Sequence, residues 1–346
     1  MRLSVLDLVP VRTDQSTADA LAATRTLARV ADEAGYHRYW LAEHHNMPSV
    51  AATNPPLLIS MVAAATSRLR VGSGGVMLPN HAPLVVAEQF ALLEAAFPGR
   101  IDLGIGRAPG TDPVTRYVLR NGAVSAEDDP VQHFPAYVDQ VIALMSPGGA
   151  GINVAGRTHA LNATPNAVSV PPVWLLGSSD YSATLAAARG LPYVFAHHFS
   201  GRGTAEALAL YRAQFQPSDA LAAPRTFLTV NAVVAESREE AERLALPQIQ
   251  AMVALRTGGT LAPQRLVEEA ELDPVPDAHR PLVDAMRSRW VIGTPESAAG
   301  KIRSLAAEFD VDEVMVHPVA GAHVGTSLDR APARDETLRL LAAELL

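Results

Sequence analysis

The sequence predicts an α/β protein of the (β/α)8 TIM-barrel class. Eight short β-rich runs alternate with helical patterns along the chain, as expected for parallel strands joined by helices. Most of these runs are almost continuously apolar, which is typical of strands covered on both faces. The length of 346 residues suits one barrel of roughly 250 residues with insertions. No Gly-x-Gly-x-x-Gly pattern follows the first run, so the dinucleotide fingerprint of a doubly wound sheet is missing there.

The elements can be placed in order along the chain. The predicted strands span residues 3–9, 39–42, 69–76, 101–106, 173–176, 193–196, 227–234 and 313–317. Between them, helices have recognisable starts, such as the box-like Ser16-x-x-Asp19 and the cap Thr294 followed by Pro295. Gly35 and Gly190 stand where helices are expected to end in a left-handed cap.

Two segments interrupt the alternation and are interpreted as insertions after strands four and seven. Residues 107–135 form a long predicted loop, followed by a helix to about residue 145 and a Gly-rich, hairpin-like stretch at 148–165. Residues 256–290 are rich in Pro, Gly and charge, and are predicted to form a lid over the barrel mouth, with a plain surface excursion left open. We expect residues 1–346 to form one barrel domain.

Composition excludes several classes of protein. The net charge of −8 argues against a nucleic-acid partner, which would need a basic face. The chain has no cysteine, so disulfides, thiolate metal sites and cysteine nucleophiles are ruled out. Neither a signal pattern nor an apolar run of roughly 18 residues is present, so we expect a cytoplasmic protein without a membrane span.

Polar and titratable residues concentrate where the predicted strands end. Because chemistry in such barrels takes place at the carboxyl ends of the strands, this clustering predicts an active site there. Six of the 11 histidines fall at these ends. They are His44, His45, His81, His197, His198 and His317.

The pair His44-His45 follows the second strand. Neighbours on a strand point to opposite faces, so at most one of the two can face the lumen in strand geometry. This weakens a metal interpretation, as does the scarcity of acids, because only Glu43 and Asp7 stand at strand ends. We therefore expect no metal centre, with His44 as the functional residue, His45 as its support, and the reverse assignment left open.

Two further segments indicate a bound phosphate and a flat ring. Gly177, Ser178 and Ser179 precede a helix, whose free N–H groups and positive end favour an anion. Arg107 ends the neighbouring fourth strand and could supply a permanent positive charge to the same anion, with an ordinary helix cap and a structural arginine left open as the alternative. Ser73-Gly74-Gly75 sits in a predicted strand, where glycines mark a bulge or the close approach of a ligand.

Several long motifs resemble the bacterial luciferase-like monooxygenases, most closely the branch labelled MsnO8-like flavin-dependent oxidoreductases. The motifs are GYHRYWLAEHHNMP at 35–48, VGSGGVMLPNH at 71–81, PGRIDLGIGRAPGT at 98–111, LGSS at 176–179 and IGTPE at 292–296. They occur in order through nearly the whole chain. The segment 256–290 has no confident match to the family.

The resemblance implies a site and an assembly. It implies reduced flavin mononucleotide (FMN), with the phosphate held by Arg107, Gly177, Ser178, Ser179 and Tyr181, and a catalytic histidine at His44. It also implies a cis peptide at Gly74-Gly75 and a homodimer built on the helices at about 55–66 and 82–96. Gly106 stands where the luciferases carry a reactive cysteine, so light emission is not expected.

The resemblance further implies a monooxygenase reaction. Reduced FMN from a separate NAD(P)H-dependent flavin reductase would react with O2 to give a C4a-(hydro)peroxyflavin, which oxygenates a small organic substrate. His44 would give or take a proton beside the flavin. Two alternatives are left open, namely hydride transfer with the deazaflavin F420 and a flavin-binding protein without turnover. The substrate cannot be read from the sequence.

Overall fold

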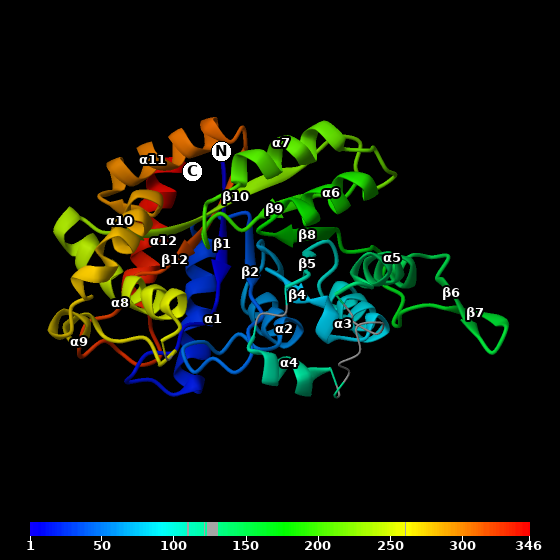
Figure 1. The fold of residues 1–346 in the computed structure, drawn as a ribbon, viewed down its shortest axis with the longest axis horizontal. Helices are drawn as coiled ribbons and strands as arrows, with labels where there is room; N and C mark the ends of the chain where they lie inside the picture. The colour runs from blue at the N-terminus through cyan, green and yellow to red at the C-terminus, as the bar shows by residue number, and fades with distance from the viewer. Residues whose placement is uncertain (109–110, 121, 123–130, 260) are drawn as a thin grey trace.

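Eight parallel strands form a closed barrel in the computed structural model, which describes residues 1–108, 111–120, 122, 131–259 and 261–346 (Figure 1). Each strand pairs in parallel with the next, and the last one pairs with the first. In order around the barrel, the strands are β1 (Arg2–Asp7), β2 (Arg38–Leu41), β3 (Arg70–Ser73), β5 (Ile101–Gly106), β8 (Val173–Gly177), β9 (Tyr193–Phe195), β10 (Thr226–Val234) and β12 (Glu313–Pro318). The predicted fold class is confirmed.

Two short strands were not predicted. The expected third strand, 69–76, is interrupted after Ser73 by the Gly74-Gly75 peptide, which is cis as expected. The chain then resumes as β4 (Val76–Met77), which pairs with the end of β5. Separately, β11 (Val291–Gly293) extends the sheet beside the end of β10. Both are too short to stand out from the sequence pattern.

Helices cover the outside of the barrel (Figure 1). In chain order, the helices of the described residues are α1 (Thr17–Glu33), α2 (Pro55–Ala65), α3 (Pro83–Ala96), α4 (Pro113–Leu119), α5 (Phe134–Met145), α6 (Asp180–Arg189), α7 (Thr204–Gln214), α8 (Arg238–Thr257), α9 (Val267–Leu272), α10 (Arg280–Arg289), α11 (Pro295–Glu308) and α12 (Pro332–Leu345), with 3-10 turns η1 (Leu78–Asn80) and η2 (Asp277–His279). Ser16 and Asp19 form the expected capping box, and Gly190 ends α6 with a φ of 60°. In the described part of the chain, no helix is long and apolar enough to cross a membrane.

The two irregular segments contain structure of their own. Between β5 and β8 lie α4, α5 and the hairpin of β6 (Ala150–Val154) and β7 (Arg157–Leu161), which projects away from the barrel (Figure 1). Pro109 and Gly110 of the quoted motif, and the part of the predicted loop at 121 and 123–130, lie outside the described residues. The segment 256–290 contains α9, η2 and α10, and both of these helices contact α8.

Charged and aromatic side chains fill the amino-terminal end of the barrel. The buried Arg38 guanidinium donates from Nη1 to Asp102 Oδ2 and from Nε to Glu313 Oε1, each at 2.6 Å. It lies over the rings of Trp174 and Phe227, at 4.9 and 5.4 Å from their centroids. These buried ion pairs and rings occupy the amino-terminal end of the barrel, opposite the carboxyl end where the predicted site residues lie.

Candidate active site

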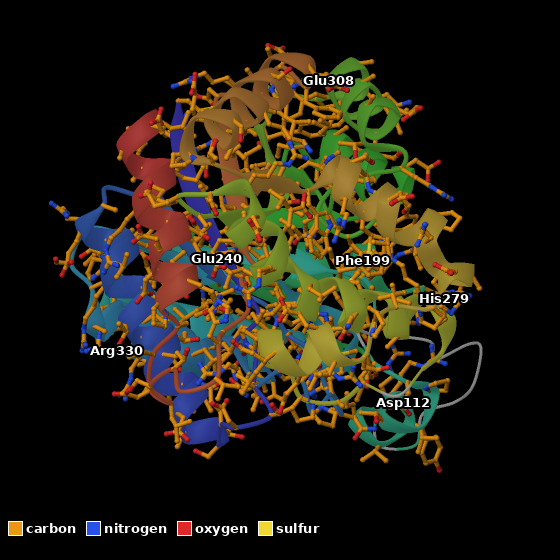
Figure 2. The ribbon with its side chains drawn as sticks, turned by 90° about the vertical axis from the view of Figure 1, so that its left-hand side faces the viewer. Asp112, Phe199, Glu240, His279, Glu308 and Arg330 are labelled. Carbon is orange, nitrogen blue, oxygen red and sulfur yellow. The ribbon has the colours of Figure 1, made fainter. Side chains whose placement is uncertain are left out.

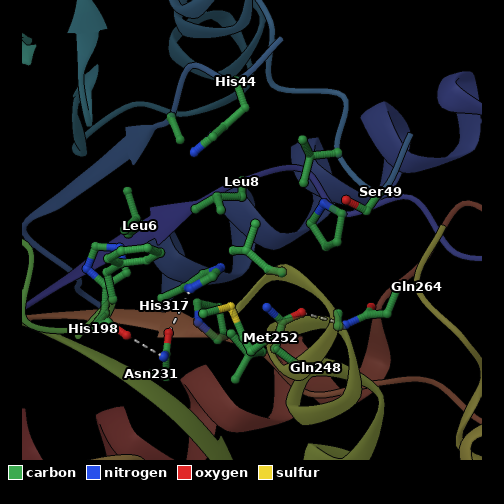
Figure 3. Close-up of a pocket in the computed structure, with 18 of the residues that line it drawn as sticks. Leu6, Leu8, His44, Ser49, His198, Asn231, Gln248, Met252, Gln264 and His317 are labelled. Atoms are coloured by element: carbon green, nitrogen blue, oxygen red, sulfur yellow. Dashed lines mark hydrogen bonds between the residues drawn. The ribbon is translucent and has the colours of Figure 1, made fainter. Parts of the chain in front are cut away.

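A cavity of about 170 Å³ opens at the carboxyl end of the barrel. Its wall is mainly apolar and is built from strand ends and from one face of α8, whose residues 248, 251, 252 and 255 line it (Figure 3). The polar side chains among the lining residues belong to His44, Ser49, His198, Asn231, Gln248, Gln264, His317 and Arg334. A concave apolar pocket with a few polar groups is the usual form of a small-molecule site.

His44 lies in the loop after β2 and lines this cavity (Figure 3). Its backbone N–H donates to the Ala52 carbonyl at 2.7 Å, which holds the loop in place. Its Nδ1 is buried and has no hydrogen-bond partner among the residues that the structure describes. Burial lowers the pKa of His44 by more than the neighbouring Glu43 carboxylate raises it. The imidazole is therefore neutral at pH 7, and its Nδ1 remains without a partner among the described residues.

His45 points to a different partner. The buried Glu43 carboxylate accepts hydrogen bonds from His45 Nε2 at 2.9 Å, His81 Nε2 at 2.7 Å and Met77 N at 2.9 Å. Burial raises the pKa of Glu43, but the hydrogen bonds from His45 and His81 outweigh it and lower that pKa to about 2. His45 does not line the cavity. The pair thus separates into one residue at the cavity and one in the packing behind it.

The Gly74-Gly75 peptide lies close to the cavity on one side and to Leu176 of β8 on the other. Gly74 lines the cavity, and a Cβ on it would lie 2.8 Å from Leu6 Cδ1. A Cβ on Gly75 would lie 2.3 Å from Leu176 Cδ1 and 2.7 Å from the Gly104 carbonyl. The buried Ser73 hydroxyl faces β5, where it donates to the Gly104 carbonyl at 2.8 Å. Ser73 therefore offers a ligand its backbone rather than its hydroxyl.

A hydrogen-bonded chain that joins the side chains of His317 and Asn231 to the backbone carbonyl of His198 forms the floor of the cavity (Figure 3). Asn231 Nδ2 donates to the His198 carbonyl at 2.8 Å, so its Oδ1 is the atom that meets His317 Nδ1 at 2.9 Å. An amide oxygen only accepts, hence His317 carries its proton on Nδ1 and leaves Nε2 as an acceptor. Burial and the neighbouring His197 lower the pKa of His198 to about 4, and burial lowers that of His317 well below its usual range.

Sequence reasoning counted His198 and His317 among the strand-end histidines but did not assign them to the site, and it missed Asn231. A signal for Asn231 was present in the predicted strand 227–234, where Thr229 and Asn231 interrupt an apolar run at a spacing of two. Such a spacing places both on one face of a strand. Both side chains contact His198, since its Nδ1 meets Thr229 Oγ1 at 2.9 Å.

The residues expected to hold a phosphate meet at the ends of β5 and β8. The Arg107 guanidinium lies 3.8 Å from the centroid of the Tyr181 ring. Ser179 occupies the cap position of α6, yet its side chain makes no capping hydrogen bond. Ser178 and Ser179 are exposed. A Cβ on Gly177 would lie 2.5 Å from Ser182 Oγ, so only glycine fits there. The helix end therefore keeps N–H groups free for an anion.

The two acids at strand ends, Asp7 and Glu43, are both hydrogen-bonded to other side chains. The buried Asp7 carboxylate accepts from Arg334 Nη2 at 2.7 Å and from Thr24 Oγ1 at 2.8 Å. Glu43 is held by the two histidines described above. Across the described ranges, no three side chains of the histidine, cysteine, aspartate and glutamate types gather into a metal-binding group.

Comparisons with known proteins show extensive similarity. A luciferase-like monooxygenase of Escherichia coli (strain K12) is 40% identical over 320 residues, which cover 91% of this chain and 90% of that protein. The N-acetyl-S-alkylcysteine monooxygenase of Bacillus subtilis (strain 168) is 33% identical over 323 residues, covering 91% and 92%. The crystal structure of apo-MsnO8 is 33% identical with a TM-score of 0.85, covering 99% of this chain and 98% of that chain.

More distant structures share the fold. The oxygenating constituent of 3,6-diketocamphane monooxygenase from the CAM plasmid of Pseudomonas putida, in complex with FMN, matches at 19% identity and a TM-score of 0.71, covering 100% and 99% of the two chains. The F420-dependent tetrahydromethanopterin reductase of Methanopyrus kandleri matches at 14% identity and a TM-score of 0.69, covering 99% of this chain and 97% of that chain. The model of the luciferase-like monooxygenase family matches residues 1–313. The chain therefore belongs to the luciferase-like monooxygenase family.

Proposed function

We propose that this protein is an FMN-dependent monooxygenase, which uses reduced FMN and O2 to oxygenate a small organic substrate. The observation that carries the proposal is the unpartnered, buried Nδ1 of His44 at an apolar cavity. This cavity is bounded by Gly74, whose neighbour Gly75 packs on Leu176, the residue before Gly177. The segment Ser73–Gly75, expected to meet the flavin ring, therefore adjoins the segment Gly177–Ser179, expected to meet the flavin phosphate.

The residues present fit the shape and charge of FMN. Gly74 lines the cavity, so a flat ring bound there would lie against the backbone of the Ser73–Gly75 segment. Arg107, with Tyr181 beneath it, and the uncapped start of α6 at Ser179 suit a phosphate. When bound, reduced FMN supplies the electrons that activate O2.

The protein's own contribution would be proton transfer and exclusion of water. His44 is neutral at pH 7, so its free nitrogen could accept a proton and return it during the same turnover. The aliphatic wall of the cavity, which includes Leu6, Leu8 and Met252, would keep water away from the reacting atoms. Leu261 and Gln264 line the same cavity, which supports a covering role for the start of the 256–290 segment.

The proposal includes a partner enzyme and a second copy of the chain. The structurally similar protein from Pseudomonas putida is the oxygenating constituent of a monooxygenase, which supports a separate reductase as the source of reduced flavin. For the homodimer, the expected helices expose apolar side chains, with Leu57 and Met61 on α2 and Val85 and Leu92 on α3. Leu57→Glu should convert a dimer to a monomer in light scattering coupled to size-exclusion chromatography, whereas a wild-type monomer would contradict the dimer.

The test of the cofactor is a titration. Apoprotein is titrated with FMN and, separately, with F420, following fluorescence. Tight binding of FMN is expected, and binding of F420 alone would replace the proposal with hydride transfer. If the protein binds FMN but forms no O2-dependent product from any compound of a metabolite panel, the result would favour a flavin-binding protein without turnover.

The test of His44 is a substitution. His44→Gln should lower the rate of product formation by about 10²–10⁴-fold, the usual contribution of a general acid or base. His159→Gln, at an exposed histidine on the projecting hairpin, is the matched control and should keep the wild-type rate. Unchanged turnover in His44→Gln would remove the assigned role.

A further inference from the structure

Three arginines lie close to one another beside the cavity. Arg202 comes from the loop after β9, Arg256 from the last turn of α8 and Arg289 from the last residue of α10. Among the described residues, none of the three forms an ion pair. Acids outnumber basic residues in this chain, with 36 Asp and Glu against 28 Lys and Arg. A cationic group that stays unpaired in an acidic protein is a candidate binding site.

Packing holds two of these arginines in place. Arg256 donates from Nη2 to the Phe199 carbonyl, and its guanidinium lies 5.7 Å from the centroid of the Phe199 ring. The side chain of Arg289 packs on Gly201, where a Cβ would lie 2.6 Å from Arg289 Cδ. Arg202 follows Gly201 directly in the chain. The side chains of Arg256 and Arg289 therefore pack on the loop 197–203, to which Arg202 belongs.

One nitrogen in this cluster has a vacant hydrogen-bonding position. Arg256 Nε is buried, and it has no hydrogen-bond partner in the part of the chain that the structure describes. A buried N–H of a charged group left unpaired costs more than one in water, and an anionic acceptor would relieve that cost.

The charges in the cluster repel one another. Burial and the charge of Arg202 lower the pKa of Arg256, and burial together with Arg256 and Arg202 lowers the pKa of Arg289. The adjacent His197 does not add a positive charge, because burial and Arg289 lower its pKa to about 4. A negatively charged group seated among the arginines would therefore stabilise the folded protein.

The cluster is continuous with the cavity. His198 and Phe199, which lie in the loop 197–203, both line the cavity, and so does Leu255, the residue before Arg256. Figure 2 looks onto this side of the molecule, where Phe199 is labelled; this residue is 46% exposed. A ligand whose charged end meets the arginines could therefore extend its apolar part past Phe199 towards His44.

We propose that Arg202, Arg256 and Arg289 bind the anionic group of the substrate, so that the substrate is a small organic acid with an apolar body. A guanidinium cluster suits a carboxylate, which accepts several charge-assisted hydrogen bonds. This proposal rests on the proposed function, since it names the substrate class of the same site. The phosphate of FMN is the other source of an anion, and the experiment separates the two.

The experiment measures binding of paired probes by isothermal titration calorimetry, with FMN-loaded protein. Hexanoate and hexan-1-ol differ in the anionic group, and FMN and riboflavin, titrated into apoprotein, differ in the phosphate. Wild type should prefer hexanoate. Arg256→Gln and Arg289→Gln should weaken hexanoate by about tenfold or more, as expected for hydrogen bonds to a charged group, and leave hexan-1-ol unchanged. Arg202→Gln, at an exposed position that packing does not depend on, should act in the same direction.

The outcomes are distinct. Equal binding of hexanoate and hexan-1-ol by wild type would overturn the proposal, as would wild-type hexanoate affinity in all three variants. A loss of the preference for FMN over riboflavin in Arg256→Gln and Arg289→Gln would also overturn it, because it would show that these arginines bind the flavin phosphate. Arg157→Gln, on the projecting hairpin, is the control. If wild type fails to bind FMN, the proposed function fails, while hexanoate binding to apoprotein still tests the arginines.

Discussion

Gly75 and Gly106 lie on neighbouring segments of the barrel wall but have different surroundings. A Cβ on Gly75 would meet Leu176 and the Gly104 carbonyl, whereas a Cβ on Gly106 would find its nearest neighbour, the Val76 carbonyl, at 4.0 Å. Overpacking a tight site costs roughly 1–3 kcal/mol, and an open site tolerates a methyl group. The two glycines therefore form a matched pair for a test of how closely backbone approaches the site.

We expect Gly75→Ala to lower the free energy of unfolding by about 1–3 kcal/mol and to weaken FMN binding. Gly106→Ala should change either quantity little. Urea denaturation and flavin titration of both variants measure the two effects. Equal stability of the two variants would show that the backbone at Gly75 can shift aside.

The residues of the site differ in how far the sequence predicts them. His44 follows a strand inside a long motif, so its position at the cavity could be predicted. Asn231 could not be separated from an ordinary polar residue in a strand, because its role depends on His198 and His317, which lie 33 and 86 residues away in the chain. The arginine cluster is harder still, since its three members come from three separate elements.

At the scale of elements, a single histidine joins α8 to α9 and to the loop after β12. His323 Nε2 contacts Glu240 Oε1 and His323 Nδ1 contacts Glu268 Oε1, both at 2.6 Å. Burial lowers the pKa of His323, but the hydrogen bonds to Glu240 and Glu268 outweigh it, so the pKa is raised. Because α8 lines the cavity, this contact also supports one wall of the site.

The raised pKa of His323 gives a pH dependence of definite sign. A histidine with a higher pKa in the folded state stabilises the fold fully below the unfolded pKa of about 6.5. This contribution is lost as the pH rises through the folded value. The difference in unfolding free energy between wild type and His323→Gln should therefore be larger at pH 6 than at pH 9. Urea denaturation at both values measures it, and a difference independent of pH would contradict the assignment.

Sequence patterns predict long elements better than short ones. The eight barrel strands have an apolar pattern long enough to recognise, and α1 and α11 begin at capping residues that the sequence shows. By contrast, the glycines after Ser73 indicated only a bulge or the close approach of a ligand, the cis peptide came from the family resemblance alone, and β11 spans only Val291–Gly293. The placement of α8 over the cavity depends on tertiary packing, which no local pattern records.

For the whole molecule, the amino-terminal end of the barrel contains a buried ion cluster, and the carboxyl end contains the cavity. Arg38, Asp102 and Glu313 are nearly fully buried at the amino-terminal end, and each charge has partners. Removing one member of a buried ion cluster leaves the others without compensation. This end lies opposite the cavity, so its effect on stability can be separated from its effect on binding.

Arg38→Met should lower the free energy of unfolding by roughly 3–5 kcal/mol. Arg238→Gln removes an exposed arginine, 3.9 Å from Glu242, and should cost less than about 1 kcal/mol. Urea denaturation compares the two, and flavin titration of folded Arg38→Met should give the wild-type affinity. Similar losses in both variants would mean that the buried cluster adds no more than a surface pair.

The projecting hairpin of β6 and β7 has a practical consequence. The chain contains no cysteine, so a His159→Cys substitution would create a single thiol on an exposed strand well outside the barrel. A fluorophore attached there would be carried on an antiparallel hairpin. Energy transfer from this label to a flavin in the cavity would report cofactor arrival in real time, without modifying any residue of the site.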